Sequence, residues 1–518
     1  MTPTTSRSAW SASSGTAPKP RNAPILLFYL LAVGLYALLF TFWQAEPVPL
    51  NVHLLAILLT ATALVPLFRW YATGREEVPI FELIVLSYAA QFSMPIYTQP
   101  NRIIIFSQPL YLEWGQIAQA LLYVEAGVLT LIISYYLARR LPFVRHAPRL
   151  DLPLHPERRR AYLLIALLGG GLVNLLQAMN LLDIGILGAI IGLAGRQVNV
   201  ALILLAYDVY RSRERRLGAH LLLYGTVLAS FIIGLTTGLL ENALIPMALL
   251  LAVRWQATRR FPWLLVTLGV ALYLVLNPAK FGYRELVWYG RETYSFSERV
   301  GLWRGLVADS TAELLPAETQ RGGGDNVQFA LARFDLVHKF AYVQEITPAI
   351  KPYYYGSTYS YFLYAWIPRL LWPAKPSAAQ ANEQLDVDYR LKAPEQGSTI
   401  GIGQLPEAYV NFGLLGIILV MSIQGFVFAL LDSSLNGPRS EGGRAIYLSV
   451  MVYFLNGIGS SAAILFGALF QQILANAVFL RPFATGWQAQ APPAAAPPPA
   501  MRPRPRPGRP RRHPRPNP

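Results

Sequence analysis

The chain has 518 residues, of which 54% are hydrophobic and only 14% are charged, whereas soluble domains carry about 25% charged residues. Long apolar runs recur from residue 24 to residue 480, so the composition excludes a soluble globular protein and predicts an all-α polytopic membrane protein. The absence of cysteine excludes disulfides, thiolate nucleophiles and Cys-ligated metals. Seven arginines in the last eighteen residues contribute much of the net charge of +16, so this charge does not indicate nucleic-acid binding.

Apolar segments of membrane-spanning length predict about twelve transmembrane helices after a polar N-terminal tail, 1–23. Nine fall within 24–277 and three within 409–480. In chain order they are 24–43, 51–69, 79–97, 117–138, 161–179, 197–211, 219–238, 240–254, 262–277, 409–431, 445–457 and 461–480. Segments 197–211, 240–254 and 445–457 are short for a span, and 181–195 is better interpreted as a re-entrant or interfacial piece.

The distribution of Lys and Arg predicts the orientation of the helices. Loops 69–78, 138–160, 211–216 and 254–260 are basic, whereas 44–50, 98–116 and 180–195 are nearly free of cations. All the basic loops fall on one side if the N-terminal tail is cytoplasmic. Twelve spans then place the C-terminus on the same side, where the Pro/Arg-rich tail 481–518 is predicted to be disordered.

Residues 278–408 form a long polar interruption that this topology places in the periplasm. A transporter rarely needs such a loop, whereas an enzyme that acts at the outer face of a membrane often does. The aromatic segment 356–367 is too short to cross a bilayer and predicts an interfacial or re-entrant helix within the loop.

Two stretches of this loop carry candidate site residues. Arg284 and Arg291 are seven residues apart, so a helix would place both on one face as a clamp for phosphate; a solvated helix with local ion pairs is the alternative. In the second stretch, Arg333 precedes Asp335 and His338 on a pattern of helical periodicity. That helix either presents a cation and a base to a cleft or is an ordinary amphipathic surface helix.

Two further candidates lie close to the predicted membrane surface. Pro368 ends the aromatic segment, and the prolines around Arg369 and Lys375 restrict both cations at headgroup depth, where they would bind a diphosphate. Ordinary interfacial snorkelling is the alternative. Glu407 lies where the tenth span begins, so it is either a base or a partner of the helix N-terminus.

The sequence is similar to the bacterial Wzy-type O-antigen and exopolysaccharide polymerases in two stretches, YYYGSTYSYFLYAWIPRLLWPAKPSAAQANEQL and LPEAYVNFGLLGIILV. The close match covers residues 353–418 and includes Arg369, Lys375 and Glu407. The resemblance implies metal-independent glycosyl transfer at the periplasmic face of the bacterial inner membrane. A glycan on undecaprenyl diphosphate would be transferred to the sugar end of a new lipid-linked repeat unit.

The expected catalytic residues are Arg369, Glu407, Asp335 and His338. The residues expected to bind diphosphate are Arg369, Lys375, Arg284, Arg291 and Arg333. We expect no cofactor and no metal, since the DVD triplet at 386–388 is too short a pattern to indicate a metal site. The expected partners are the undecaprenyl-diphosphate-linked oligosaccharide, membrane lipid and a chain-length regulator protein.

Two other functions remain open from the sequence. The first is an O-antigen ligase or another lipid-linked glycosyltransferase, which would use the same kind of donor. The second is a non-enzymatic polysaccharide flippase or exporter. A transporter coupled to protons would be expected to place several ionisable groups toward the middle of the membrane.

Overall fold

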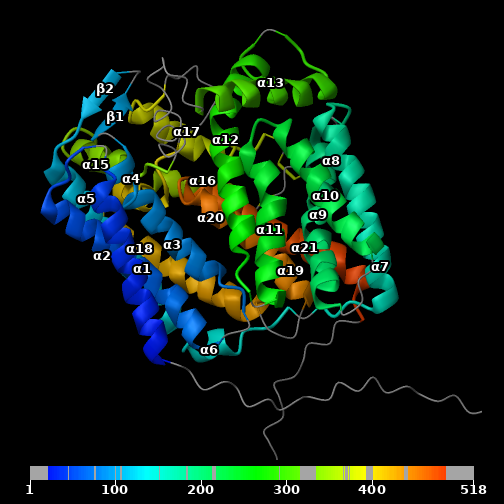
Figure 1. Cartoon of the computed structure of the whole chain (residues 1–518). Coiled ribbons are helices and arrows are strands. Elements are labelled where there is room, and N and C mark those ends of the chain that lie inside the picture. Colours follow the sequence, from blue (N-terminus) through cyan, green and yellow to red (C-terminus); the bar gives the residue numbers. More distant parts are fainter. Residues whose placement is uncertain are drawn as a thin grey trace, which may run out of the picture.

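The computed structural model describes residues 22–44, 46–74, 77–99, 101–105, 108–150, 152–182, 185–212, 217–258, 260–290, 292–314, 334–365, 367, 371–372, 374–392, 401–436 and 441–485. These residues form a helical bundle with a short hairpin at one end (Figure 1). The first half contains α1 Asn22–Phe42, α2 Leu50–Ala72, α3 Ile80–Phe92, α4 Pro95–Thr98, β1 Arg102–Ile105, β2 Gln108–Tyr111, α5 Trp114–Ala138, α6 Pro142–Arg145, α7 Pro156–Leu164, the π-helical turn η1 Ile165–Gly169, α8 Gly170–Ala178 and α9 Gly185–Arg211.

The second half begins with three long helices, α10 Leu217–Leu235, α11 Leu240–Thr258 and α12 Trp263–Val287. Shorter elements follow: α13 Phe296–Leu314, α15 Val337–Ile346, η2 Ser357–Tyr359, α16 Ser360–Ala365 and α17 Ala379–Asp388. The chain returns to the bundle with α18 Gln404–Leu435, α19 Glu441–Met451, α20 Tyr453–Gly457, α21 Ala462–Leu480 and η3 Arg481–Phe483.

Nine helical segments in the described part of the chain are long and apolar enough to cross a membrane, so the chain is a polytopic membrane protein. They are Ile25–Phe42, Leu50–Ala72, Ile80–Thr98, Trp114–Ala138, Pro156–Ala178, Leu217–Leu235, Trp263–Val287, Gln404–Leu435 and Ala462–Phe483. Each coincides with a predicted span. The other three predicted spans lie in α9, α11 and α19–α20, which are helical but are not among the nine.

Three sequence-based details are wrong. Residues 185–195 do not form a separate re-entrant piece, because α9 is one continuous helix of 27 residues. The helix predicted to end at 277 continues through Pro278 to Val287, so the loop begins later than expected. Strands β1 and β2 pair antiparallel, with Arg102 opposite Tyr111, in a loop for which no strand was predicted.

The arginine-rich helix ends meet at one end of the bundle, which we call the basic end. Arg159, at the start of α7, lies 2.7 Å from Asp208 of α9. Glu441, at the start of α19, pairs with Arg159 and Arg211 at 2.5 and 2.9 Å. Other contacts at this end join Arg139 to Asp432 and Glu77, Arg254 to the ring of Tyr210, and Trp70 to Trp255.

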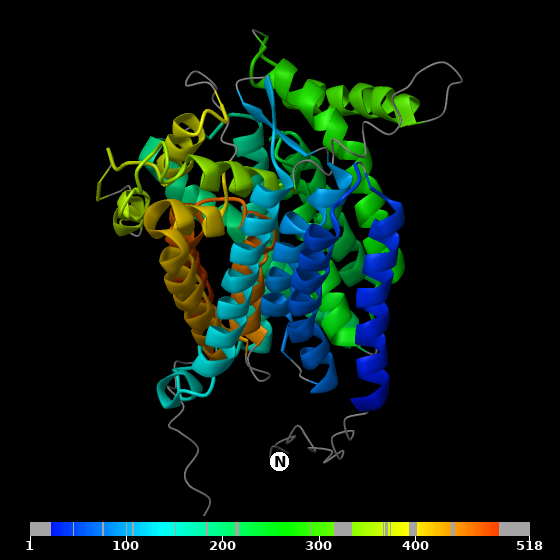
Figure 2. The same cartoon turned by 90° about the vertical axis from the view of Figure 1, so that its left-hand side faces the viewer.

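The elements between α12 and α18 gather at the opposite end, which we call the loop end. Figures 1 and 2 show α13, α15, α17 and the β-hairpin there, with α13 lying across the bundle. The gathering of the basic segments at one end and of the long loop at the other agrees with the predicted alternation of basic and cation-poor loops.

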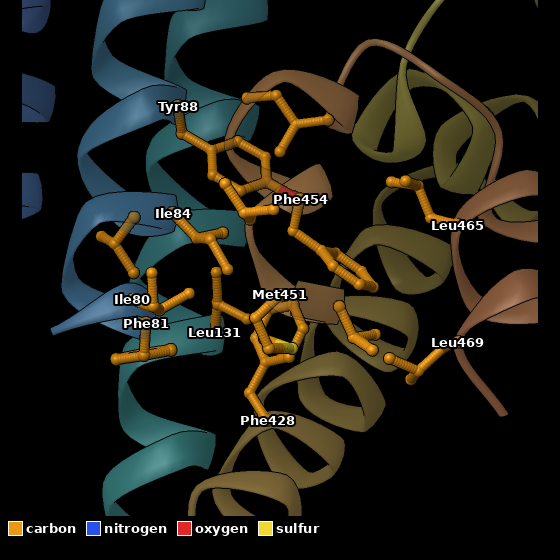
Figure 3. Close-up of a cluster of buried hydrophobic side chains, with 14 of the residues drawn as sticks. Ile80, Phe81, Ile84, Tyr88, Leu131, Phe428, Met451, Phe454, Leu465 and Leu469 are labelled. Carbon is orange, nitrogen blue, oxygen red and sulfur yellow. The ribbon is translucent and has the colours of Figure 1, made fainter. Parts of the chain in front are cut away.

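Apolar side chains of α3, α5, α18, α19, α20 and α21 meet at the centre of the bundle (Figure 3). Phe81 of α3 stacks on Tyr135 of α5 with ring centroids 3.5 Å apart. The ring of Phe428 of α18 lies edge-on to that of Phe454 of α20, at 5.3 Å. Because α3, α5, α18, α19, α20 and α21 share this packing, they form a central frame beside which the remaining helices stand.

Candidate functional site

A cavity of about 1310 Å³ lies among α8, α9, α10 and α11, next to the central frame. Three cationic side chains line it: Arg196 from the middle of α9, Arg299 from α13, and Lys375. Among the described residues, no Asp or Glu lines the cavity. Amides and hydroxyls such as Asn174 and Tyr453 supply further polar contacts. A cavity with this lining is suited to an anionic ligand that also offers hydroxyl groups.

Arg299 is fixed at the loop end of the cavity. Its side chain is 9% exposed, one guanidinium nitrogen donates to the carbonyl of Ala178 at the end of α8, and its buried Nε has no partner among the described residues. One turn later, Trp303 donates to the carbonyl of Leu235 at 3.0 Å and stacks on Tyr283 at 5.0 Å. Helix α13 is therefore anchored to α8, α10 and α12.

Helix α13 begins with a local signal in the sequence. The backbone N–H of Ser295 donates to the Glu298 carboxylate at 2.8 Å, and the backbone N–H of Glu298 donates to the Ser295 hydroxyl at 3.4 Å. This S-x-x-E capping box satisfies donors at the helix start. The two hydrogen bonds from Ser295 lower the pKa of Glu298, which is exposed. The box sets the register that directs Arg299 toward α8.

Of the five cations predicted to bind diphosphate, the structure describes two, Lys375 and Arg284. Lys375 lines the cavity, and its Nζ donates to the carbonyl of Ile367 at 2.7 Å. Arg284 does not line it: its Nε donates to the carbonyl of Gly238 at 2.8 Å, and its guanidinium lies 4.2 Å from the ring of Trp288. The other three, Arg291, Arg333 and Arg369, lie outside the described residues.

Arg196 and Arg299 were not among the site residues predicted from the sequence. Arg196 interrupts the apolar run GAIIGLAGRQVNV, and an ionisable residue inside a membrane helix is by default a candidate for function. Arg196 falls between the two predicted segments 181–195 and 197–211, so it was not recognised as a residue inside a membrane helix. Arg299 had no comparable signal, because its position depends on how α13 packs.

Asp335 and His338, two of the predicted catalytic residues, form a hydrogen-bonded pair. Nδ1 of His338 lies 2.8 and 2.9 Å from the two carboxylate oxygens of Asp335. His338 is fully buried, and its Nε2 has no partner among the described residues. A carboxylate on Nδ1 favours the proton there, which leaves a lone pair on Nε2 to accept a proton.

The Asp335–His338 pair lies close to the cavity but does not line it. Leu336, between the two residues, packs against Gly403 and Gly459. Gly459 follows α20 directly, and Tyr453 at the start of α20 lines the cavity. Helix α20 and the residues after it therefore connect the pair to the cavity lining.

Glu407, the third predicted base, is fully buried and anchors another helix. Its Oε2 accepts a hydrogen bond of 2.7 Å from the backbone N–H of Ala462, the first residue of α21, whereas Oε1 has no partner among the described residues. Burial raises the pKa of nearby Tyr359, and the charge of Glu407 adds to this effect. This geometry favours the alternative of a helix N-terminal partner.

Asn411 joins the two stretches that resemble the polymerase family. Its Nδ2 donates to the hydroxyl of Thr358 and the carbonyl of Glu407, each at 2.8 Å, and its Oδ1 accepts the backbone N–H of Gly356 at 2.8 Å. The YGSTY stretch and the NFG stretch thus hold each other in place. We call this arrangement the Asn411 clamp.

A kink in α18 supports the clamp. Gly413 has a φ of 65°, and a Cβ there would lie 3.0 Å from the hydroxyl of Tyr353, so the position requires glycine. The carbonyls of Val410 and Asn411 accept hydrogen bonds from the backbone N–H groups of Tyr354 and Tyr355, at 2.9 and 3.2 Å. The kink lets these carbonyls bond the 354–355 backbone.

The DVD carboxylates are engaged in structural contacts. Oδ1 of Asp386 accepts the backbone N–H of Gly401 at 2.8 Å. The Asp388 carboxylate pairs with Lys351 at 2.9 Å and accepts the hydroxyl of Tyr354 at 2.5 Å. Within the described ranges, no group of three or more His, Asp or Glu side chains could hold a metal ion.

Comparison with known proteins identifies one family. A family model described as a domain of unknown function, DUF8712, matches residues 173–478, which is more than half of the chain. This region contains most of the cavity lining, the Asp335–His338 pair and the Asn411 clamp, whereas the start of α8 precedes it. No curated protein and no solved structure matches the chain.

Proposed function

The chain belongs to the DUF8712 family, a domain of unknown function, and we propose that it polymerises undecaprenyl-diphosphate-linked oligosaccharide repeat units. The proposed product is O-antigen or exopolysaccharide, and the proposed location is the outer face of the bacterial inner membrane. The observation that carries the proposal is the cavity with three cations and no described carboxylate in its lining. A lipid diphosphate has the charge for such a site, and its glycan has hydroxyls for the amides and hydroxyls around it.

The proposed orientation places the basic end in the cytoplasm and the loop end outside, because basic segments are retained on the cytoplasmic side. We further propose that α9, α11 and α19–α20 complete the twelve crossings. Helix α9 has 27 residues, or about 40 Å at about 1.5 Å per residue. Its Arg196 lines the cavity, as is usual for a charge inside a membrane protein.

In the proposed transfer, the acceptor hydroxyl oxygen forms a bond to the anomeric carbon of the donor glycan. The bond from that carbon to the diphosphate oxygen breaks, and its electron pair leaves with the diphosphate. Arg196, Arg299 and Lys375 stabilise the charge that develops there. The hydroxyl proton passes to Nε2 of His338, which Asp335 orients.

His338 is fully buried and does not line the cavity, so this assignment requires the packing around His338 to open toward the donor when both substrates bind. Asp335 and Glu407 are less suited as bases because both are already hydrogen-bonded. Asp335 accepts a hydrogen bond from Nδ1 of His338, and Glu407 accepts one from the backbone N–H at the start of α21. Arg369, Arg291 and Arg333 remain proposed diphosphate contacts on the grounds of sequence.

The test is polymerisation by the purified protein supplied with lipid-linked repeat units, read as a ladder of chain lengths. Removing one hydrogen-bond donor that stabilises developing charge typically lowers the rate by about 10²–10³. We therefore expect the polymerisation rate of Arg299→Gln to fall by that factor. Arg304→Gln is the matched control, because Arg304 is exposed on the same helix and does not line the cavity. A wild-type ladder from Arg299→Gln at equal protein level would overturn the role of the cavity.

The same assay separates the alternatives. A ligase would form no ladder from repeat units alone and would transfer glycan only when lipid A core is added. A flippase would form no glycosidic bond in either case and would move the labelled repeat unit across a vesicle membrane. Either result would replace the polymerase assignment.

A further inference from the structure

The cavity is open toward the lipid-facing side of the bundle, between α8 and α10. Leu168 and Leu172, on η1 and α8, line the cavity and are 65% and 55% exposed. Leu221 of α10 also lines the cavity and is 65% exposed. A residue that is exposed and lines the cavity marks an opening. Figure 1 shows α8 and α10 at the edge of the bundle.

Glycines keep this opening wide. Gly171 of α8 and Gly225 of α10 both line the cavity, and a Cβ added to either would meet no atom within 4 Å. Gly170, by contrast, packs closely against Val198 of α9. The space beside Gly171 and Gly225 is therefore open, and a larger side chain would fit there without a clash.

Charge and apolar surface are arranged in order along the opening. Arg299 bonds the carbonyl of Ala178 at the loop end of α8, whereas Leu168 lies ten residues earlier, toward the basic end. At about 1.5 Å per residue, this is a separation of about 15 Å. An anionic group bound at the loop end would leave an attached apolar chain beside the exposed leucines.

We propose that the opening between α8 and α10 is a lateral portal for the apolar chain of a lipid diphosphate. Its headgroup binds Arg196, Arg299 and Lys375, and its chain leaves the cavity between Gly171 and Gly225 into the bilayer. The identity of the headgroup rests on the proposed function. The occupant follows from charge complementarity at the loop end and from the apolar, membrane-facing rim.

The test compares two ligands that differ only by a tail, farnesyl diphosphate and inorganic diphosphate. Binding to the purified full-length protein is measured in amphipol, so that no lipid competes. Gly225→Trp on α10 and Gly171→Trp on α8 are each expected to weaken the binding of farnesyl diphosphate at least about tenfold, or about 1.4 kcal/mol. Neither substitution should change the binding of inorganic diphosphate. Arg299→Gln should weaken both ligands.

Gly218→Trp is the control for the added tryptophan. Gly218 lies on α10, a Cβ there also meets no atom within 4 Å, and the residue does not line the cavity. If Gly225→Trp and Gly171→Trp both bind farnesyl diphosphate as tightly as the wild type does, the portal proposal is wrong. The proposal is also wrong if the two tryptophan substitutions weaken the binding of both ligands equally, or if the wild-type protein binds neither ligand. Intact tail-dependent binding without polymerisation would instead refute the proposed function and retain the portal.

Discussion

Replacing Asn411 tests whether the family-like stretches are joined by the Asn411 clamp. In Asn411→Ala, the partly buried N–H of Gly356 loses its acceptor, and the buried Thr358 hydroxyl and Glu407 carbonyl each lose a donor. Leaving one buried polar group unsatisfied costs about 1–3 kcal/mol. Because the Thr358 hydroxyl can rotate to another partner, we expect a total loss of about 2–4 kcal/mol in the free energy of unfolding.

The assay is unfolding of the purified protein by a denaturing detergent in mixed micelles. Asn242→Ala is the matched control, since Asn242 makes one exposed hydrogen bond of 3.2 Å to Thr237 and its loss should cost less than about 0.5 kcal/mol. Asn411→Asp retains the acceptor for Gly356 but places a second carboxylate beside Glu407, so it should be no more stable than Asn411→Ala. If Asn411→Ala loses no more free energy of unfolding than Asn242→Ala does, the three hydrogen bonds do not hold these stretches together.

Three further predictions concern chemistry and orientation. Polymerisation should continue in excess EDTA; loss of activity that magnesium restores would return a role to the DVD triplet at 386–388. Lys375→Arg should retain most of the transfer rate because it keeps the charge, whereas Lys375→Met should lose about 10²–10³ of it; equal rates in the two variants would show that its charge is not used. A cysteine at Ser377 in this cysteine-free chain should react with an impermeant maleimide in intact spheroplasts, and one at Arg145 of the basic end should react only after lysis. The opposite pattern would invert the orientation.

Long apolar helices could be predicted from the sequence because their signal is local. A run such as 117–138 must bury its backbone in hydrocarbon whatever its neighbours are, and the structure places α5 at Trp114–Ala138. The hairpin at Arg102–Tyr111 was harder, because its two strands have only four residues each. Such short strands depend on tertiary support more than on their own pattern.

The site could be predicted only in part, because its residues come from distant segments. Lys375 was identified from its prolines and lies in the cavity, whereas Arg299 reaches it only through the packing of α13 on α8. Glu407 shows the limit of reasoning from residue type. Its position at the start of α18 fitted both a base and a helix partner, and the contact with Ala462, which favours the second, depends on how α21 packs.

The hydrogen-bonded interior below the cavity is our reason for proposing a transferase and not a flippase. The amide of Gln197, next to Arg196, accepts the Tyr162 hydroxyl at 3.0 Å and donates to Asn476 at 2.8 Å, and Asn476 donates to Ser449 at 3.1 Å. These residues are buried, and the ion pairs of the basic end lie beyond them. A headgroup moving to the basic end would have to break both the hydrogen bonds of Gln197 and Asn476 and the ion pairs of the basic end. A headgroup entering from the side reaches the cations without breaking either set of contacts. An anion that arrives laterally and is held at one face is placed for reaction at that face.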